Sequence, residues 1–245
     1  MTKQTKRKPK KKQAAKTRRR PMRAVVRFVS KVALIGLAAA VCLTLIYAVF
    51  NPPTTPYMFA EARRGGVDHE WVDMDLIAPV MARSAVAAED ARFCLHWGLD
   101  VRAIRAVVDA GGRGGASTIS QQVIKNVYLW QGRSWVRKSA EALWTPLAEV
   151  FWSKRRILEL YLNVAEFDQG VFGVQAASRH YFDRDAADLT SVQAARLAAI
   201  LPNPKGRNAA NPSNATRRRA ASIMDGAATI AADGRAACFE TDAPH

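Results

Sequence analysis

The first 31 residues contain no aspartate or glutamate, although they hold 14 of the 37 lysine and arginine residues of the chain. Beyond them, 23 basic residues nearly balance 21 acidic residues, so most of the formal charge of +16 belongs to this tail. A charge distribution this uneven excludes a single soluble globule and leaves two interpretations of residues 1–31. They form either a nucleic-acid-binding arm or the flank of a membrane segment.

Charged residues of both signs are absent from residues 32–50, a run of 19 mostly apolar residues. As a helix this run covers about 28 Å, close to the thickness of the hydrocarbon core of a bilayer. We therefore predict a transmembrane helix here and interpret the tail as its cytoplasmic flank, because such flanks carry an excess of Lys and Arg. A cleaved signal peptide is the alternative, although its apolar region is usually only about 7–15 residues long.

Cysteine is also scarce. Cys42, Cys94 and Cys238 form neither an even set nor a metal-binding spacing. We therefore expect no stabilising disulfide and no structural metal site.

Alternating strand patterns are nearly absent, whereas helix start and stop signals are frequent. We predict an all-α domain at 71–232, after a membrane-proximal linker at 51–70 and before a tail at 233–245. Pro146 interrupts the helix expected from Trp135 to Trp152, where a kink follows if the helix continues. The signals are a first-turn Pro79, capping boxes Thr118-x-x-Gln121 and Thr190-x-x-Gln193, N-caps at Ser134 and Ser153, and a stop at Pro202.

Five segments of this domain carry an ordered set of polar residues. Residues 89–98 (EDARFCLHWG) and 115–122 (GASTISQQ) resemble the first two motifs of the peptidoglycan glycosyltransferases, which polymerise lipid-linked disaccharide into cell-wall glycan. Residues 137–141 (RKSAE), 154–163 (KRRILELYLN) and 194–204 (AARLAAILPNP) resemble motifs three to five.

The resemblance extends from about Trp71 to Met224. It is closest to the monofunctional biosynthetic transglycosylases, because the Ser-x-x-Lys and Lys-Thr-Gly triplets of a penicillin-binding domain are absent from the sequence. It implies a lysozyme-like fold with an additional membrane-facing lobe.

Glu89 is the candidate catalytic base. Glycosyl transfer from a lipid diphosphate needs a base for the attacking hydroxyl and cations for the leaving group. Met81, Ala85 and Ala88 recur at helical spacing, and Glu89 falls at the edge of that apolar face, where burial would raise its pKa. The spacing alone does not decide the role of Glu89, because most carboxylates at such positions are solvated. The resemblance, however, implies that Glu89 is a general base acting on the 4-hydroxyl of the acceptor.

The resemblance also implies roles for the neighbours of Glu89. Asp90 and His96 would support the local hydrogen-bond network, and Phe93 would pack beneath it. We include Asp90 and Phe93 among the candidate substrate-binding residues, whereas His96 is interpreted as structural.

The second motif places Thr118, Gln122 and Lys125 on one face of a helix expected to start near Ser117. The glycines of residues 111–115 would bring backbone N–H groups close to an anion, although a merely flexible loop is an equal alternative. We expect any mobile flap built from the segment Leu99 to Gly115 to be small, because this segment is short for the family. The candidate substrate-binding residues of this motif are Ser117, Thr118, Gln122 and Lys125.

In the third motif, Arg137 and Glu141 stand at i and i+4, a spacing that often means only a surface ion pair. The resemblance implies that Arg137 and Lys138 bind the diphosphate and that Glu141 is a second catalytic carboxylate. We expect no tightly bound cofactor. Mg²⁺ or Mn²⁺ remains possible at a phosphate site, but the sequence contains no dedicated set of metal ligands.

Together these features predict a single-pass inner-membrane enzyme with a cytoplasmic N-terminus and a periplasmic catalytic domain. The resemblance implies that it joins lipid II to a growing lipid-linked glycan and releases undecaprenyl diphosphate with inversion. The alternatives are a wall-cleaving enzyme like the lytic transglycosylases and an inactive membrane-anchored scaffold. Proteins of division or elongation are possible partners, and no nucleic acid is expected.

The predicted orientation can be measured directly. A reporter fused after His245 should be active only if it is of a type that works in the periplasm, because the basic tail holds the N-terminus in the cytoplasm. Activity of a cytoplasm-specific reporter at the same position would reverse the orientation.

Overall fold

The computed structural model describes residues 19–112, 115–132 and 134–240, with side chains from Met22 onward. The start of the basic tail, part of the glycine-rich loop and the end of the C-terminal tail lie outside the described residues. The chain divides into two units, Met1–Leu43 and Thr44–His245.

The first unit contains most of helix α1 (Arg19–Val49). Among the described residues, Met22–Val49 is the one stretch long and apolar enough to cross a membrane. The helix starts before the predicted residue 32, within the basic tail. Lys and Arg are good helix formers, so Arg23, Arg27 and Lys31 extend the helix without interrupting it.

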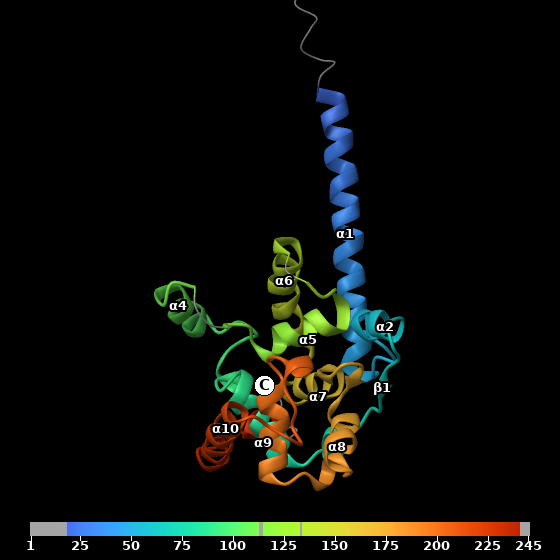
Figure 1. Ribbon diagram of the computed structural model, residues 1–245. Helices are drawn as coiled ribbons and strands as arrows, with labels where there is room; N and C mark the ends of the chain where they lie inside the picture. Colours follow the sequence, from blue (N-terminus) through green and yellow to red (C-terminus); the bar gives the residue numbers. More distant parts are fainter. Residues whose placement is uncertain (1–18, 113–114, 133, 241–245) are drawn as a thin grey trace, which may run out of the picture. The chain divides into compact units, whose positions relative to one another are not determined.

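The second unit is built mainly of helices, as the all-α prediction requires (Figure 1). Its helices are α2 (Pro56–Ala62), α3 (Pro79–Glu89), α4 (Val101–Asp109), α5 (Ile119–Tyr128), α6 (Trp135–Phe151), α7 (Lys154–Val164), α8 (Val174–Phe182), α9 (Ser191–Ile200), α10 (Asn214–Ala232) and α11 (Ala237–Glu240). Single 3₁₀ turns lie at Met74–Leu76, Phe93–Leu95, Ala186–Asp188 and Pro204–Gly206.

A small sheet was not predicted. Strands β1 (Asp68–His69), β2 (Glu166–Asp168) and β3 (Val171–Phe172) lie in the order β1-β3-β2, with β1 parallel and β2 antiparallel to β3. Strands of two or three residues are too short to show an alternating pattern, which explains why the sequence did not reveal them.

The helix signals of the sequence are confirmed. Both predicted capping boxes are present at the starts of α5 and α9, and Ser134 and Ser153 cap α6 and α7. Pro79 lies in the first turn of α3. α9 ends at Ile200, two residues before Pro202.

Helix α6 continues through Pro146. Proline lacks the N–H that would bond to the carbonyl oxygen of Ala142. The preceding hydroxyl of Thr145 donates to the carbonyl oxygen of Glu141 at 2.7 Å, which satisfies a neighbouring acceptor. Glu149, beyond the proline, is firmly held: it accepts from Ser120 Oγ at 2.5 Å and pairs with Lys154 Nζ at 2.9 Å.

The core forms two packed groups of helices, α3 with α9 and α10, and α5 with α6 and α7. α7 is the central element, since eight of its eleven residues are buried. Asn163 near its end is fully buried and exchanges hydrogen bonds with the backbone N–H and C=O of Val72, each at 2.9 Å. These bonds tie the start of the domain to its core helix.

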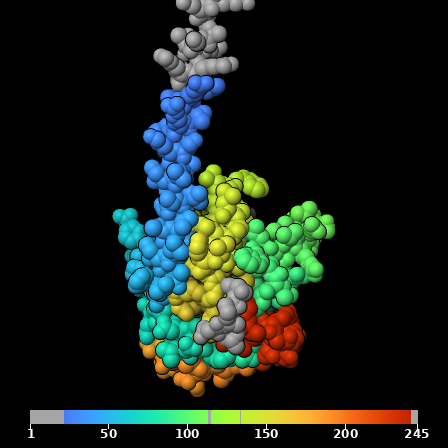
Figure 2. Space-filling model, turned by 180° about the vertical axis from the view of Figure 1, so that it is seen from behind, coloured from blue at the N-terminus to red at the C-terminus, as the bar shows by residue number. Residues whose placement is uncertain are grey.

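Helix α4 lies apart from both groups. All of its residues are exposed or half-buried, and it stands out from the rest of the second unit (Figure 2). Asp100 caps its N-terminus by accepting from the backbone N–H groups of Arg102 and Ala103. The region predicted as a small flap is therefore a short capped helix.

The expectation that no disulfide forms is wrong. Cys94 and Cys238 are bonded, with their Cα atoms 5.9 Å apart across a sequence separation of 144 residues. Cys42 in α1 is the free cysteine. The sequence, with its odd number of cysteines, did not reveal this pair, because only the folded chain brings Cys94 and Cys238 together.

Candidate active site

The site begins where the C-terminus of α3 meets the second turn of α5. Glu89 is the last residue of α3, and its side chain is only 13% exposed. Its Oε2 accepts from Gln122 Nε2 at 3.0 Å, and Arg219 Nη2 lies 3.7 Å from its Oε1. Burial raises the pKa of Glu89, while the amide and Arg219 oppose that change. A carboxylate in this state is a stronger base than a solvated one.

Asp90 faces the protein interior. Its Oδ1 contacts His96 Nε2 at 2.9 Å, and its Oδ2 accepts from the backbone N–H of Ile119 at 3.1 Å. Ile119 is the first residue of α5, so Asp90 holds the start of that helix against the end of α3. These contacts agree with the supporting role inferred for Asp90 from the sequence, and substrate binding by Asp90 stays a prediction.

Phe93 and Thr118, two of the predicted substrate-binding residues, make contacts within the protein. Phe93 is fully buried, and Lys154 Nζ lies 4.5 Å from the centroid of its ring, so it packs beneath the motif. Thr118 is the N-cap of α5, and its hydroxyl donates to the carbonyl oxygen of Gly98 at 2.6 Å. Thr118 also lines a small surface depression together with Glu89 and Asp90, and substrate binding by both residues stays a prediction.

A cluster of cations lies on the other side of Gln122. Lys125, Arg137 and Lys138, with Ser117, Gln122 and Glu141, line a hollow of about 240 Å³. Burial and then the charge of Arg137 lower the pKa of Lys125, and burial followed by its cationic neighbours lowers that of Lys138. The mutual repulsion of these cations favours an anionic ligand.

Glu141 is the counter-ion of this cluster. It is 2% exposed, forms an ion pair with Arg137, and contacts Lys138 Nζ at 3.0 Å. Lys138 Nζ also donates to Ser117 Oγ at 3.0 Å. Its carboxylate faces both cations and can orient them, and its role as a second catalytic carboxylate stays a prediction.

The described side chains form no dedicated metal centre. Within residues 19–112, 115–132 and 134–240, no group of three or more His, Cys, Asp or Glu side chains could hold a metal. The carboxylate nearest the cations, Glu141, is already paired.

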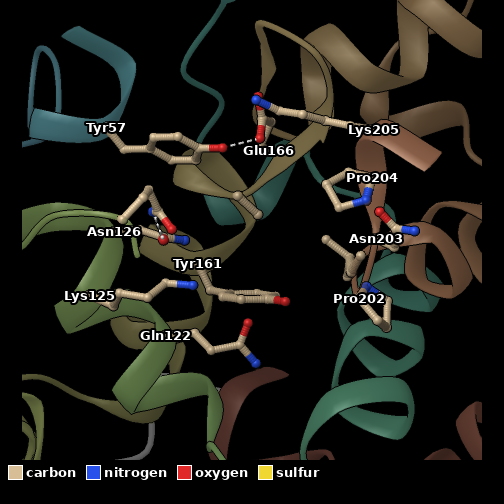
Figure 3. Close-up of a pocket in the computed structure, with 13 residues that line it drawn as sticks. Tyr57, Gln122, Lys125, Asn126, Tyr161, Glu166, Pro202, Asn203, Pro204 and Lys205 are labelled. Carbon is tan, nitrogen blue, oxygen red and sulfur yellow. Dashed lines mark hydrogen bonds and ion pairs between the residues drawn. The ribbon is translucent and has the colours of Figure 1, made fainter. Parts of the chain in front are cut away.

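A second hollow, of about 360 Å³, lies beyond Lys125, and the sequence did not predict it (Figure 3). Lys205 Nζ lies 3.2 Å from both Glu166 and Glu61, and Tyr57 donates to Glu166. Gln122 and Lys125 line both hollows. The other polar side chains around the second hollow are Asn126, Gln131, Tyr161 and Asn203.

The sequence indicated Tyr161, Lys205 and Arg219 only weakly as residues near the site. Tyr161 belongs to the fourth motif, and Lys205 directly follows the fifth motif. Arg219 is one of three consecutive arginines, which usually indicate a solvated surface. Only the fold brings Arg219 beside Glu89.

Residues 58–228 match the family model described as Transglycosylase. A protein of Jannaschia sp. (strain CCS1) named biosynthetic peptidoglycan transglycosylase is 59% identical over 209 residues, covering 84% of this chain and 87% of its own. Proteins of the same name from Xanthomonas campestris pv. campestris (strain B100) and Caulobacter vibrioides (strain ATCC 19089 / CIP 103742 / CB 15) are 45% identical over 235 residues and 43% identical over 210 residues. They cover 91% and 84% of this chain, and 95% and 92% of their own lengths.

The chain is therefore a glycosyltransferase. It belongs to the peptidoglycan transglycosylase family, as its five motifs predicted, and its activity is the polymerisation of peptidoglycan glycan.

The surroundings of Glu89 predict a pH effect. A base must be unprotonated, so the rate falls as the pH drops through the pKa of Glu89. Arg219 lowers this pKa. Arg219→Gln should raise it further and move the acid limb of the kcat/KM profile to higher pH. Arg218→Gln, at an exposed position of the same helix, is the matched control. An unchanged acid limb in Arg219→Gln would assign it to another group.

Proposed function

We propose that this site transfers a lipid-linked growing glycan to the 4-hydroxyl of the N-acetylglucosamine of lipid II, with release of undecaprenyl diphosphate. The observation that carries the proposal is the position of Gln122. It donates to the base Glu89 and also lines the cationic hollow, so a base and an anion site lie on either side of one side chain.

Glu89 acts on the acceptor. Its carboxylate removes the proton of the 4-hydroxyl as that oxygen attacks the anomeric carbon of the donor. The bond between this carbon and the diphosphate oxygen breaks from the opposite side, which inverts the configuration. The raised pKa of Glu89 favours the proton transfer.

Arg137, Lys138 and Lys125 stabilise the leaving diphosphate. Arginine can make two parallel charge-assisted hydrogen bonds to a phosphate, whereas lysine acts as a point charge. Glu141 keeps Arg137 and Lys138 oriented between turnovers. Burial, followed by repulsion from neighbouring cations, lowers the pKa of both lysines, and a bound diphosphate would relieve that repulsion.

The second hollow suits the acceptor sugar. Its walls carry amide, hydroxyl and ammonium groups that can bind sugar hydroxyls, and Gln122 connects it to Glu89. In this arrangement Gln122 and Lys125 lie between the acceptor and the donor diphosphate.

The cation cluster also favours polymerisation over wall cleavage. A hydrolase of this kind must protonate a sugar leaving group and needs an acid, whereas a diphosphate leaves as an anion and needs cations. An inactive scaffold would gain nothing from burying Glu89 beside such a cluster.

The catalytic domain is proposed to lie outside the cytoplasm, anchored in the inner membrane by α1. The Cys94–Cys238 disulfide supports this location, because disulfides persist in oxidising compartments such as the periplasm.

Glu89→Gln tests the base. The substitution keeps the shape of the side chain and removes its basicity, so polymerisation of lipid II should fall roughly 10²- to 10⁴-fold while the fold persists. Glu70→Gln, at an exposed surface ion pair, is the control and should remain active. Near-normal strand synthesis by Glu89→Gln would mean that another group accepts the proton.

Arg137→Ala tests the diphosphate site. It should weaken both turnover and the binding of a phosphate-bearing inhibitor of the donor site, whereas Glu89→Gln should leave inhibitor binding largely intact. Arg184→Ala, at an exposed position on another face, controls for loss of charge. Tight inhibitor binding by Arg137→Ala would reduce its role to the ion pair with Glu141.

A further inference from the structure

The first motif is held from outside by the C-terminal segment 235–240. Cys94 is bonded to Cys238, and Arg235 Nη1 donates to the carbonyl oxygen of Ala91 at 2.9 Å. Both anchors lie within five residues of Asp90. The segment therefore contacts the short stretch that connects the catalytic base to the rest of the motif.

The same segment is fixed to two helices of the core. Phe239 is fully buried, with its ring centroid 6.4 Å from that of Phe93. Arg155 of α7 donates to the carbonyl oxygen of Phe239 at 3.2 Å, and Arg83 of α3 pairs with Glu240 at 2.8 Å. α11 is a four-residue helix, too short to be stable alone, so these contacts and the disulfide hold it in place.

The motif itself has little regular structure to keep it in position. Between the end of α3 and Gly98 it contains one 3₁₀ turn, Phe93–Leu95, and Cys94 lies within that turn. A displacement of this turn would reach Asp90 and His96, and through Asp90 the start of α5. The separation between Glu89 and Gln122 depends on that junction.

We propose that the Cys94–Cys238 disulfide is a redox-dependent positioning element for Glu89. When it is formed, segment 235–240 holds residues 90–98 in the arrangement that sets Glu89 against Gln122. When it is reduced, this arrangement loosens and polymerisation slows, while the cation cluster and the fold remain. The inference rests on the proposed function, because its effect is on the polymerisation step.

The redox step is a thiol–disulfide exchange with an external disulfide. The thiolate of Cys94 attacks one sulfur of the external disulfide and releases its other half as a thiol. The thiolate of Cys238 then attacks the Cys94 sulfur and releases the second thiol. Two protein thiols are oxidised and one external disulfide is reduced. Both cysteines are half-buried, so an external thiol can reach them for the reverse reaction.

The test uses the full chain in detergent with lipid II as substrate. Oxidised wild type, wild type reduced with dithiothreitol, and wild type reoxidised after its removal are compared with Cys94→Ser/Cys238→Ser. Cys42→Ser is the matched control, because it removes the free thiol and keeps the disulfide. The readouts are kcat and KM, the Kd of the donor-site inhibitor, and the midpoint of thermal unfolding.

Reduction and the double substitution should each lower kcat by about 10-fold, because misplacing a catalytic group by a fraction of an ångström is costly. Inhibitor Kd should change less than about 2-fold. The unfolding midpoint should fall by roughly 5–15 °C, and kcat is measured well below it. Reoxidation should restore kcat. Phe239→Ala, which keeps the disulfide but removes packing on Phe93, should also lower kcat with little effect on inhibitor binding.

Equal kcat in the oxidised, reduced and doubly substituted proteins would overturn the proposal and leave the disulfide a cross-link for stability alone. Three free thiols in the denatured, unreduced protein would overturn it as well. If the proposed function itself is wrong, the oxidised wild type will not polymerise lipid II. That result is distinguishable from equal kcat in all forms of the protein, and it would also overturn this inference.

Discussion

The carboxylate of Asp90 is the contact on which the geometry of the site depends. It follows α3 directly and accepts the first backbone N–H of α5, so one side chain joins the helix that carries Glu89 to the helix that carries Gln122 and Lys125. Charge-assisted hydrogen bonds of this kind contribute about 1.5–3 kcal/mol each, and the N-terminal end of a helix favours a negative charge. His96, held by the second oxygen of Asp90, keeps the carboxylate in its orientation.

Lys154 adds a second layer of support below this contact. Its ammonium donates to the carbonyl oxygen of His96 at 2.8 Å and pairs with Glu149 at 2.9 Å, and it lies above the ring of Phe93. Burial lowers the pKa of Lys154, while Glu149 opposes that change and keeps the charge in place. The basic residue that opens the fourth motif thus supports the first motif from inside the protein.

Motif order and helix signals were sufficient to predict the helical class and both capping boxes, whereas the roles proposed for Glu89 and for the cations of the third motif come from the family resemblance. Contacts between distant segments were not predictable. Tyr57 and Lys205 meet at Glu166 although they lie far apart in the chain, and Cys94 meets Cys238 across 144 residues. The directions of Phe93 and Thr118 also depended on packing, because a motif specifies residue type without saying which side of the backbone faces the cleft.

Three glutamates near the site, Glu89, Glu141 and Glu149, differ in their partners, and that difference favours Glu89 as the base. Glu141 faces Arg137 and Lys138, and Glu149 faces Lys154 and the hydroxyl of Ser120. Glu89 meets a neutral amide at 3.0 Å and an arginine only at 3.7 Å. A carboxylate with a close counter-ion has little tendency to accept a proton, whereas one buried beside a neutral donor retains that tendency. This difference supports the proposal that Glu89 accepts the proton, while the paired carboxylates hold cations in place.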